Sequence, residues 1–303
     1  MSYPDFYIVG APKCGTTALA SYLEQSDSIY FHRKEIHYFG TDLKFNRPRV
    51  NLKTYEKKTQ VLSNKGMVGD ASVYYLYSES AAREIFEANP NAKIIICLRH
   101  PVDFMCSLHA QLLSNADEVE RDFVAALNLE KSRIKGQNVP WYTHPVHALF
   151  YRKMSHFSSQ VIRYKNIFGA EQVKIVLLDQ LAKETSSVVK GVYQFLNIEA
   201  PNSLRLDVVN PSSDVRFRWL KIVHKTLFSA DGKIREFLPS MIMRPIDFVF
   251  FRLMSKKATK HKISRDVYQS LCEEFDDEIL CLEQEIGLSL ESWKSSSNLK
   301  SDV

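Results

Sequence analysis

The sequence lacks the cysteine patterns that mark disulfide frameworks and structural metal sites. An odd number of cysteines without a framework favours a reduced compartment. We therefore expect free thiols in a cytoplasmic protein. The five cysteines, in a chain of 303 residues, form no C-x-x-C pair and show no Cys/His spacing typical of metal ligands; they are Cys14, Cys97, Cys106, Cys272 and Cys281.

Long apolar runs, targeting signals and dense basic clusters are also missing. No apolar stretch is long enough to span a membrane, and the chain enters a strand pattern at Phe6 without a preceding signal peptide. The formal net charge of +5 is mild, and no basic patch with interleaved aromatics points to nucleic acid. This composition is typical of a soluble globular protein that binds an anionic ligand.

Strand and helix patterns alternate along the chain, without repeats or linkers. The β-branched run Ala92–Leu98 is typical of a central parallel strand covered on both faces. The pattern predicts one α/β domain over residues 1–303, a three-layer open parallel sheet flanked by helices, with a helical C-terminal third and a polar tail from Ser295. Further strands are expected at Phe6–Gly10, Met67–Ala71 and Val173–Leu178, and helices at Thr16–Gln25, Ser78–Ala88, from Pro101, and at Val119–Ser132, His147–Phe168 and Val188–Leu196.

The stretch Phe6–Leu19, FYIVGAPKCGTTAL, reads as a buried strand, a glycine-bearing loop and the start of a helix. Loop amides, the positive end of a helix dipole and the ammonium of Lys13 would point at one spot, which favours a phosphate-like ligand. The loop differs from G-x-x-x-x-G-K-[ST], because Lys13 precedes Gly15. The alternative is an ordinary strand-to-helix turn with a surface lysine.

A second anion site is indicated by Ile94–Ser107, IIICLRHPVDFMCS. Arg99 ends a buried strand, and Ser107 lies about two helical turns into the next helix. A guanidinium and a hydroxyl that converge in this way bind phosphate well. The alternative for Arg99 is an ion pair with Asp103. Taken together, the two sites fit a nucleotide with phosphates at both ends of its ribose.

These motifs resemble the nucleotide signatures of sulfotransferases that use 3′-phosphoadenosine 5′-phosphosulfate (PAPS). GAPKCGTTAL resembles the 5′-phosphosulfate loop, and LRHPVDFMCSLHAQL the 3′-phosphate element. The later segments IVLLDQL, YQFLNIEAP and LEQEIGLSLESW fit more weakly. The resemblance implies a P-loop NTPase-like fold, closest in motif to carbohydrate, heparan-sulfate-type and bacterial members. It places the 5′-phosphosulfate on Lys13, Cys14, Gly15, Thr16 and Thr17, and the 3′-phosphate on Arg99 and Ser107.

The segment HRKEIHYFG is similar to a loop of the heparan-sulfate and related carbohydrate sulfotransferases. The resemblance implies that Glu35 is the base that takes a proton from the acceptor and that Lys13 stabilises the leaving oxygen. It leaves His37 to orient the acceptor or to share proton transfer. The alternatives are a solvated carboxylate at Glu35 and a packed loop histidine at His37.

Other residues carry weaker predictions. The segment GDASVYYL departs from the E-K-[ST]-x-x-Y-F pattern of the carbohydrate enzymes, and we expect its Asp70 to pair with a nearby base rather than to bind an acceptor hydroxyl or act as a second carboxylate. Arg216 is a candidate second contact to the 3′-phosphate. The segment Met241–Lys262 reads as a core helix with a basic end, or as a peripheral membrane contact. Candidates for stacking on adenine are Trp141, Tyr142, Tyr151 and Phe195.

The predicted function is transfer of a sulfuryl group from PAPS to a hydroxyl or amine, on a carbohydrate or another hydroxylated acceptor. Alternatives are a P-loop-like kinase or nucleotidase and a non-catalytic nucleotide-binding module. The scheme requires no metal, and the sequence has no GK[ST] residue to hold Mg²⁺. The compartment would be the Golgi lumen if the chain is a trimmed piece of an anchored enzyme.

Overall fold

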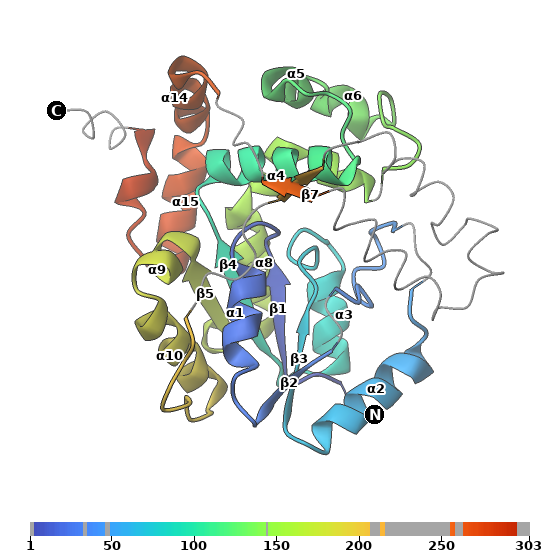
Figure 1. The fold of residues 1–303 in the computed structure, drawn as a ribbon, viewed down its shortest axis with the longest axis vertical. Coiled ribbons are helices and arrows are strands. Elements are labelled where there is room, and N and C mark those ends of the chain that lie inside the picture. Colours follow the sequence, from blue (N-terminus) through green and yellow to red (C-terminus); the bar gives the residue numbers. More distant parts are fainter. Residues whose placement is uncertain are drawn as a thin grey trace.

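Five parallel strands form one open sheet in the order β2-β3-β1-β4-β5 (Figure 1). In this computed structural model the structure describes residues 3–32, 35–45, 49–143, 145–206, 213–215, 255–257 and 263–295. The sheet confirms the predicted α/β class. Its strands are Phe6–Gly10 (β1), Ile29–Phe31 (β2), Met67–Ala71 (β3), Lys93–Leu98 (β4) and Val173–Leu177 (β5).

The apolar central strands account for the layered build. Every residue of β1 is buried, and β4 is buried after its first residue, so both faces of the sheet need cover. Helix α1 packs against α10, whereas α8 packs against α3 and α15 (Figure 1). These helices are Thr16–Leu23 (α1), Ala81–Ala88 (α3), Phe157–Phe168 (α8), Thr185–Leu196 (α10) and Asp276–Ile286 (α15).

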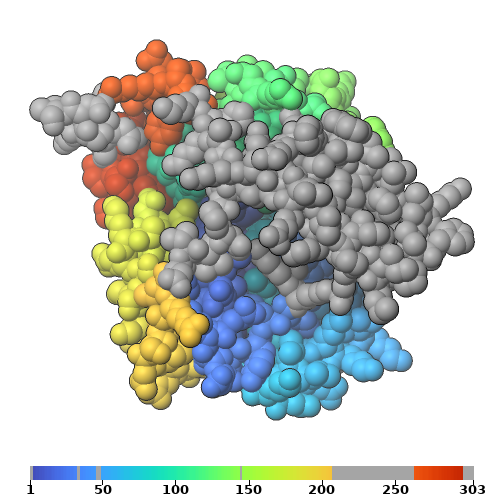
Figure 2. All heavy atoms as spheres, in the orientation of Figure 1, coloured from blue at the N-terminus to red at the C-terminus, as the bar shows by residue number. Residues whose placement is uncertain are grey.

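The remaining elements surround this core. In Figure 2 the N-terminal residues around α1 lie between α10 and α2, with α14 and α5 at the other end of the molecule. A short antiparallel pair, Ser213–Val215 (β6) with Ser255–Lys257 (β7), forms a separate sheet. The other helices are Leu52–Ser63 (α2), Pro101–Asn115 (α4), Phe123–Asn128 (α5), Glu130–Ile134 (α6), Val146–Leu149 (η1), Tyr151–Ser155 (α7), Ala170–Gln172 (η2), Leu178–Lys183 (α9), Arg265–Glu274 (α14) and Glu291–Trp293 (η3).

Two predicted helices are wrong in their extent. The helix expected over Val119–Ser132 begins later, at Phe123, because the Asp122 carboxylate caps that start by accepting from the amide of Ala125 at 2.8 Å, and it is divided at Leu129 into α5 and α6. The helix expected over His147–Phe168 is the three pieces η1, α7 and α8. The amides that begin α7 and α8 donate to carboxylates of distant residues, Glu130 and Glu278. Because Glu130 and Glu278 are far along the chain from the helix starts that they cap, the local sequence gives no sign of these two caps.

Smaller differences affect element ends. Strand β2 and helix α2 were not predicted, α1 ends at Leu23, α3 begins at Ala81, and α10 begins earlier, at Thr185. The helical prediction for the C-terminal third holds for α14 and α15, whereas β7 is a strand. The polar tail after residue 295 and the greater part of Met241–Lys262 lie outside the described residues.

Candidate active site

The loop after β1 turns back on the start of α1 through residues in the left-handed region. Lys13 has φ 64° and Gly15 has φ 84°. A Cβ at Gly10 would lie 2.5 Å from the carbonyl oxygen of Val73, so only glycine fits where the strand ends. Gly15 is the N-cap of α1, and no side chain caps that end. The N-terminal amides and positive dipole end of α1 therefore make this end of the helix suited to bind an anion.

This loop and Arg99 meet at one edge of the sheet. The amide of Ala11 donates to the carbonyl of Cys97 at 2.7 Å, joining the loop to the end of β4. Burial raises the pKa of the Cys14 thiol well above its usual range, and the charges of Arg99 and Lys13 both oppose that rise. Both cations therefore lie near the Cys14 thiol. Since Cys14 is fully buried, its side chain does not face a ligand.

The Arg99 guanidinium is only loosely paired. It lies 3.6 Å from the carboxylate of Asp103, and the two side chains are 27% and 42% exposed. An exposed pair at this separation holds an arginine weakly. Ser107 lies on α4, partly buried, two turns beyond Arg99. The pair with Asp103 thus exists, and it leaves Arg99 available to a phosphate.

Glu35 lies on an exposed turn beside the end of β3. Its amide donates to the carbonyl of Ala71 at 3.2 Å, and its φ is 58°. Burial raises the pKa of the Tyr74 phenol, and the charge of Glu35 adds to that rise, so the carboxylate lies near Tyr74. The structure therefore places Glu35 in the loop that follows β2, at the carboxyl edge of the sheet, beside the end of β3; β3 is the neighbour of β1, the strand that leads into the Lys13 loop.

His37 is packed among aromatic rings. Its ring stacks on Phe45 with centroids 4.4 Å apart and meets the edge of Tyr75 at 6.2 Å. Burial lowers the pKa of His37 to about 4, and the Arg49 charge acts in the same direction. The imidazole is therefore neutral at neutral pH and a weak base. This geometry favours the packed loop histidine over a residue that shares proton transfer.

Arg49, which the sequence did not single out, holds the backbone of the Glu35 loop, defined here as residues 35–43. Its guanidinium donates to five carbonyls, those of the four successive residues His37 to Gly40 and that of Leu43, and a polar loop gives no local signal for such a set of contacts. The distances are 2.8 Å to His37, 2.9 Å to Tyr38, 2.7 Å to Phe39 and 2.7 Å to Leu43, with a further contact to Gly40.

The prediction that Asp70 pairs with a base is wrong. Asp70 is fully buried in β3, and its carboxylate accepts hydrogen bonds from hydroxyl groups instead. The donors are Ser72 at 2.7 Å, Tyr55 at 2.9 Å and Tyr75 at 3.2 Å. Tyr55 comes from α2, a helix that the sequence analysis missed, so the cluster could not be assembled in advance.

The candidates for stacking on adenine separate clearly. Tyr151 is fully buried and donates to Glu118 at 2.7 Å, so it is excluded. Phe195 packs under Lys93, the first residue of β4, at the edge of the sheet opposite the loop, and is excluded too. Trp141 is 72% exposed and Tyr142 is partly buried beside it, so both stay as candidates. Arg216 lies outside the described residues.

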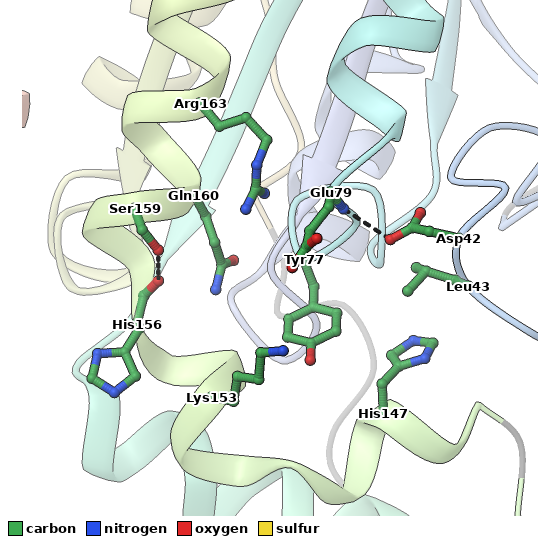
Figure 3. Close-up of a pocket in the computed structure, with 10 residues that line it drawn as sticks. All are labelled: Asp42, Leu43, Tyr77, Glu79, His147, Lys153, His156, Ser159, Gln160 and Arg163. Atoms are coloured by element: carbon green, nitrogen blue, oxygen red, sulfur yellow. Dashed lines mark hydrogen bonds between the residues drawn. The ribbon is translucent and has the colours of Figure 1, made fainter. Parts of the chain in front are cut away.

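A polar cavity of about 450 Å³ opens between the Glu35 loop, the segment after β3 and helix α8 (Figure 3). The cations of Lys153 and Arg163 and the anions of Asp42 and Glu79 line it. The buried ring of His147 closes one side, and its Nε2 has no hydrogen-bond partner.

The cavity and the Glu35 loop share an aromatic wall. His147 meets the ring of Tyr74 at 5.3 Å and that of Phe45 at 5.9 Å, and both rings also contact His37. The cavity and the packed ring of His37 therefore lie on two sides of the same aromatic wall.

No helix in the described part of the chain combines the length and the apolar character needed to cross a bilayer. No three histidine, cysteine, aspartate or glutamate side chains there gather as ligands for a metal ion.

Comparison with known proteins places this geometry in a family. The family model of the sulfotransferase domain matches residues 3–236. Human heparan sulfate glucosamine 3-O-sulfotransferase 5 is 24% identical over 245 residues, which cover 80% of this chain and 67% of that protein. Membrane-associated sulfotransferase kil1 of Dictyostelium discoideum is 36% identical over 101 residues, 33% of this chain. The chain spans about a fifth of kil1 by this match, which covers 21% of that protein.

A solved structure shares the fold. The sulfotransferase from Alicyclobacillus acidocaldarius superposes with a TM-score of 0.70 at 24% identity, and the match covers 97% of this chain and 99% of that one. The predicted fold class and the predicted family are thus confirmed. Because the sulfotransferase model matches most of its length, the chain belongs to the sulfotransferase family.

Proposed function

We propose that this sulfotransferase takes its sulfuryl group from PAPS and transfers it to a hydroxyl or amine of a carbohydrate. The observation that carries the proposal is the pairing of two cationic sites on neighbouring strands. The Lys13 loop follows β1 and Arg99 follows β4, and the hydrogen bond from Ala11 to Cys97 joins them. PAPS has phosphates on both the 3′ and the 5′ side of its ribose, so it fits two such sites at once.

The residues at the sheet edge suit the two ends of this nucleotide. The amides of Gly15, Thr16 and Thr17 would hold the 5′-phosphate at the N-terminus of α1, where no side chain caps the helix. Cys14 would contribute its backbone only. Arg99 and Ser107 would hold the 3′-phosphate, the guanidinium by charge-assisted hydrogen bonds. Arg216 stays a further candidate for the same phosphate.

PAPS supplies the sulfuryl group, whose bond to the 5′-phosphate oxygen breaks as a bond to the acceptor oxygen or nitrogen forms. Lys13 would stabilise the negative charge that grows on the leaving phosphate oxygen. Glu35 would accept the proton that the acceptor releases. His37, neutral and packed, would contribute by shaping the acceptor side. No step in this scheme requires a metal ion.

The polar cavity is the proposed acceptor site. A sugar offers hydroxyls that both donate and accept hydrogen bonds, and the cavity offers cations at Lys153 and Arg163 opposite anions at Asp42 and Glu79 (Figure 3). Two relatives support a carbohydrate acceptor by their names. One is the heparan sulfate glucosamine 3-O-sulfotransferase 5 described above, and the other is human carbohydrate sulfotransferase 15, which is 23% identical over 266 residues. That second match covers 70% of this chain and 47% of that protein.

Calorimetric titration with adenosine 3′,5′-bisphosphate, in buffer containing a chelator, tests the donor. We expect tight binding without Mg²⁺. Mg²⁺-dependent ATP binding with no bisphosphate binding would contradict the proposal and favour the kinase or nucleotidase alternative. Labelled PAPS offered with a panel of polysaccharides then tests turnover. Donor binding with no transfer to any of them is the result that a non-catalytic module predicts.

A further inference from the structure

Asp70 is a buried carboxylate beside the Glu35 loop that neither binding site uses. It lies one residue before the end of β3 with none of its side chain exposed. Its Oδ1 accepts from Ser72, and its Oδ2 accepts from Tyr55 and Tyr75. Burial raises the pKa of Asp70, and the three hydroxyl donors oppose that rise. A buried carboxylate with this many donors is a built feature that needs a role.

Two of the three hydroxyls continue to the backbone of the Glu35 loop. The amide of His37 donates to Oγ of Ser72 at 3.1 Å, and the amide of Phe39 donates to the hydroxyl of Tyr75 at 3.2 Å. A hydroxyl has one proton and two lone pairs, so donation to Asp70 leaves each oxygen to accept from the loop. The carboxylate thus sets the direction of two hydrogen-bonded chains, which we call relays. In each relay a loop amide donates to a hydroxyl and the hydroxyl donates to Asp70, and successive hydrogen bonds in such a chain strengthen one another.

The carbonyl groups of the Glu35 loop face a cation. The carbonyls from His37 to Gly40, and that of Leu43, accept from the guanidinium of Arg49. The loop therefore has its amides tied to a negative charge and its carbonyls tied to a positive one. Glu35 and His37 both occupy the left-handed region, at φ 58° and φ 48°. Residues other than glycine persist there only where their surroundings hold them.

We propose that Asp70 is a positioning residue for Glu35, acting through Ser72 and Tyr75 on the backbone of the Glu35 loop. The catalytic half of this inference rests on the proposed function, because it takes Glu35 as the base. The ordering of the loop does not rest on it.

Tyr55 supplies a matched control. Its hydroxyl donates to Asp70 at 2.9 Å, between the 2.7 Å of Ser72 and the 3.2 Å of Tyr75. Tyr55 comes from α2, however, and it reaches the Glu35 loop only through its ring, which stacks on Tyr38. Tyr55→Phe removes a hydrogen bond from Asp70 and keeps that ring. Asp70→Asn keeps all three hydroxyls and removes the charge. A general weakening of the packing around Asp70 would disorder the Glu35 loop in both variants, whereas loss of the relays would disorder it in Asp70→Asn alone.

Hydrogen–deuterium exchange of peptides covering residues 35–45 tests the ordering without any substrate. We expect exchange at least tenfold faster in Asp70→Asn and within twofold of the parent in Tyr55→Phe. Unchanged exchange in Asp70→Asn, or an equal rise in both, would overturn the inference. If Asp70→Asn does not fold, Ser72→Ala and Tyr75→Phe each remove one relay and must raise the exchange.

Transfer kinetics test the link to Glu35. The probe is labelled PAPS with chemically desulfated heparan sulfate. We expect Asp70→Asn to lower kcat about tenfold and to leave the Kd for adenosine 3′,5′-bisphosphate within twofold. In a Glu35→Gln background the same change should lower kcat less than twofold. An equal loss in both backgrounds would show that Asp70 does not act through Glu35. Full activity of the single variant Glu35→Gln would instead contradict the proposed function. The exchange result would still decide whether Asp70 orders the Glu35 loop.

Discussion

The amide of Ala11 donates to the carbonyl of Cys97 at 2.7 Å, and this bond joins the loop that carries Lys13 to β4, the strand that Arg99 directly follows. The strands involved, β1 and β4, are parallel neighbours. Two cations from segments more than 80 residues apart are thereby fixed at one edge of the sheet. The separation of their sites is therefore set by the pairing of these two strands.

Lys13→Ala should slow transfer strongly. If the ammonium stabilises the leaving oxygen, its removal lowers kcat by about 100- to 1000-fold, the loss typical of a group that stabilises developing charge. The measurement is the turnover of labelled PAPS with a carbohydrate acceptor. Lys65→Ala is the control, since Lys65 is an exposed lysine just before β3, at the opposite edge of the sheet. Equal rates for Lys13→Ala and the parent would remove Lys13 from the mechanism.

Arg99→Ala should weaken the binding of the 3′-phosphate and leave the binding of the 5′-phosphate unchanged. Loss of charge-assisted hydrogen bonds costs about 1.5–3 kcal/mol, or roughly 10- to 100-fold in the Kd for adenosine 3′,5′-bisphosphate. Binding of adenosine 5′-monophosphate, which lacks the 3′-phosphate, should not change. Asp103→Asn, which removes the 3.6 Å ion pair and keeps an oxygen that can accept from the hydroxyl of Tyr268, should bind both nucleotides normally. An equal loss of affinity for both nucleotides in Arg99→Ala would show that Arg99 does not read the 3′ side.

Acid should destabilise the fold through its buried histidines. Burial lowers the pKa of His37 to about 4 and that of His147 to about 3. Both stay neutral in the fold below the ordinary value of 6.5, where the unfolded chain takes up protons. The free energy of unfolding should therefore fall as the pH drops from about 6.5 toward 4.

The measurement is the urea midpoint at pH 7.5, 5.5 and 4.5. His147→Phe removes a buried nitrogen that has no partner, and it should flatten this dependence and stabilise the fold at pH 5.5. A slope as steep in His147→Phe as in the parent would mean that His147 is protonated inside the fold.

Local patterns predicted the parts of the site that one segment builds. The order strand, glycine loop, helix in Phe6–Leu19 was enough to place Lys13 at the start of α1, and the buried run before Arg99 was enough to put that arginine at the same edge. Parallel strands carry their following loops to one edge, so this step needs no tertiary information.

The parts that failed depend on contacts between distant segments. Asp70 looked like a partner for a base because Tyr55, fifteen residues earlier, gave no sign of reaching it. The breaks on either side of α7 depend on the carboxylates of Glu130 and Glu278, which lie on other helices. Arg49 reads as an ordinary loop arginine until its carbonyl partners are seen. A helical or strand period contains none of this information.

The most direct test of the central claim is the transfer of label from PAPS to a carbohydrate by the parent protein and by Glu35→Gln, in chelating buffer. Glu171→Gln, an exposed change in η2, is the control. Loss of a general base typically costs about 100- to 10,000-fold. We expect transfer without metal, a loss of that size in Glu35→Gln, normal transfer in Glu171→Gln and normal bisphosphate binding in all three. Undiminished transfer by Glu35→Gln would contradict the central claim.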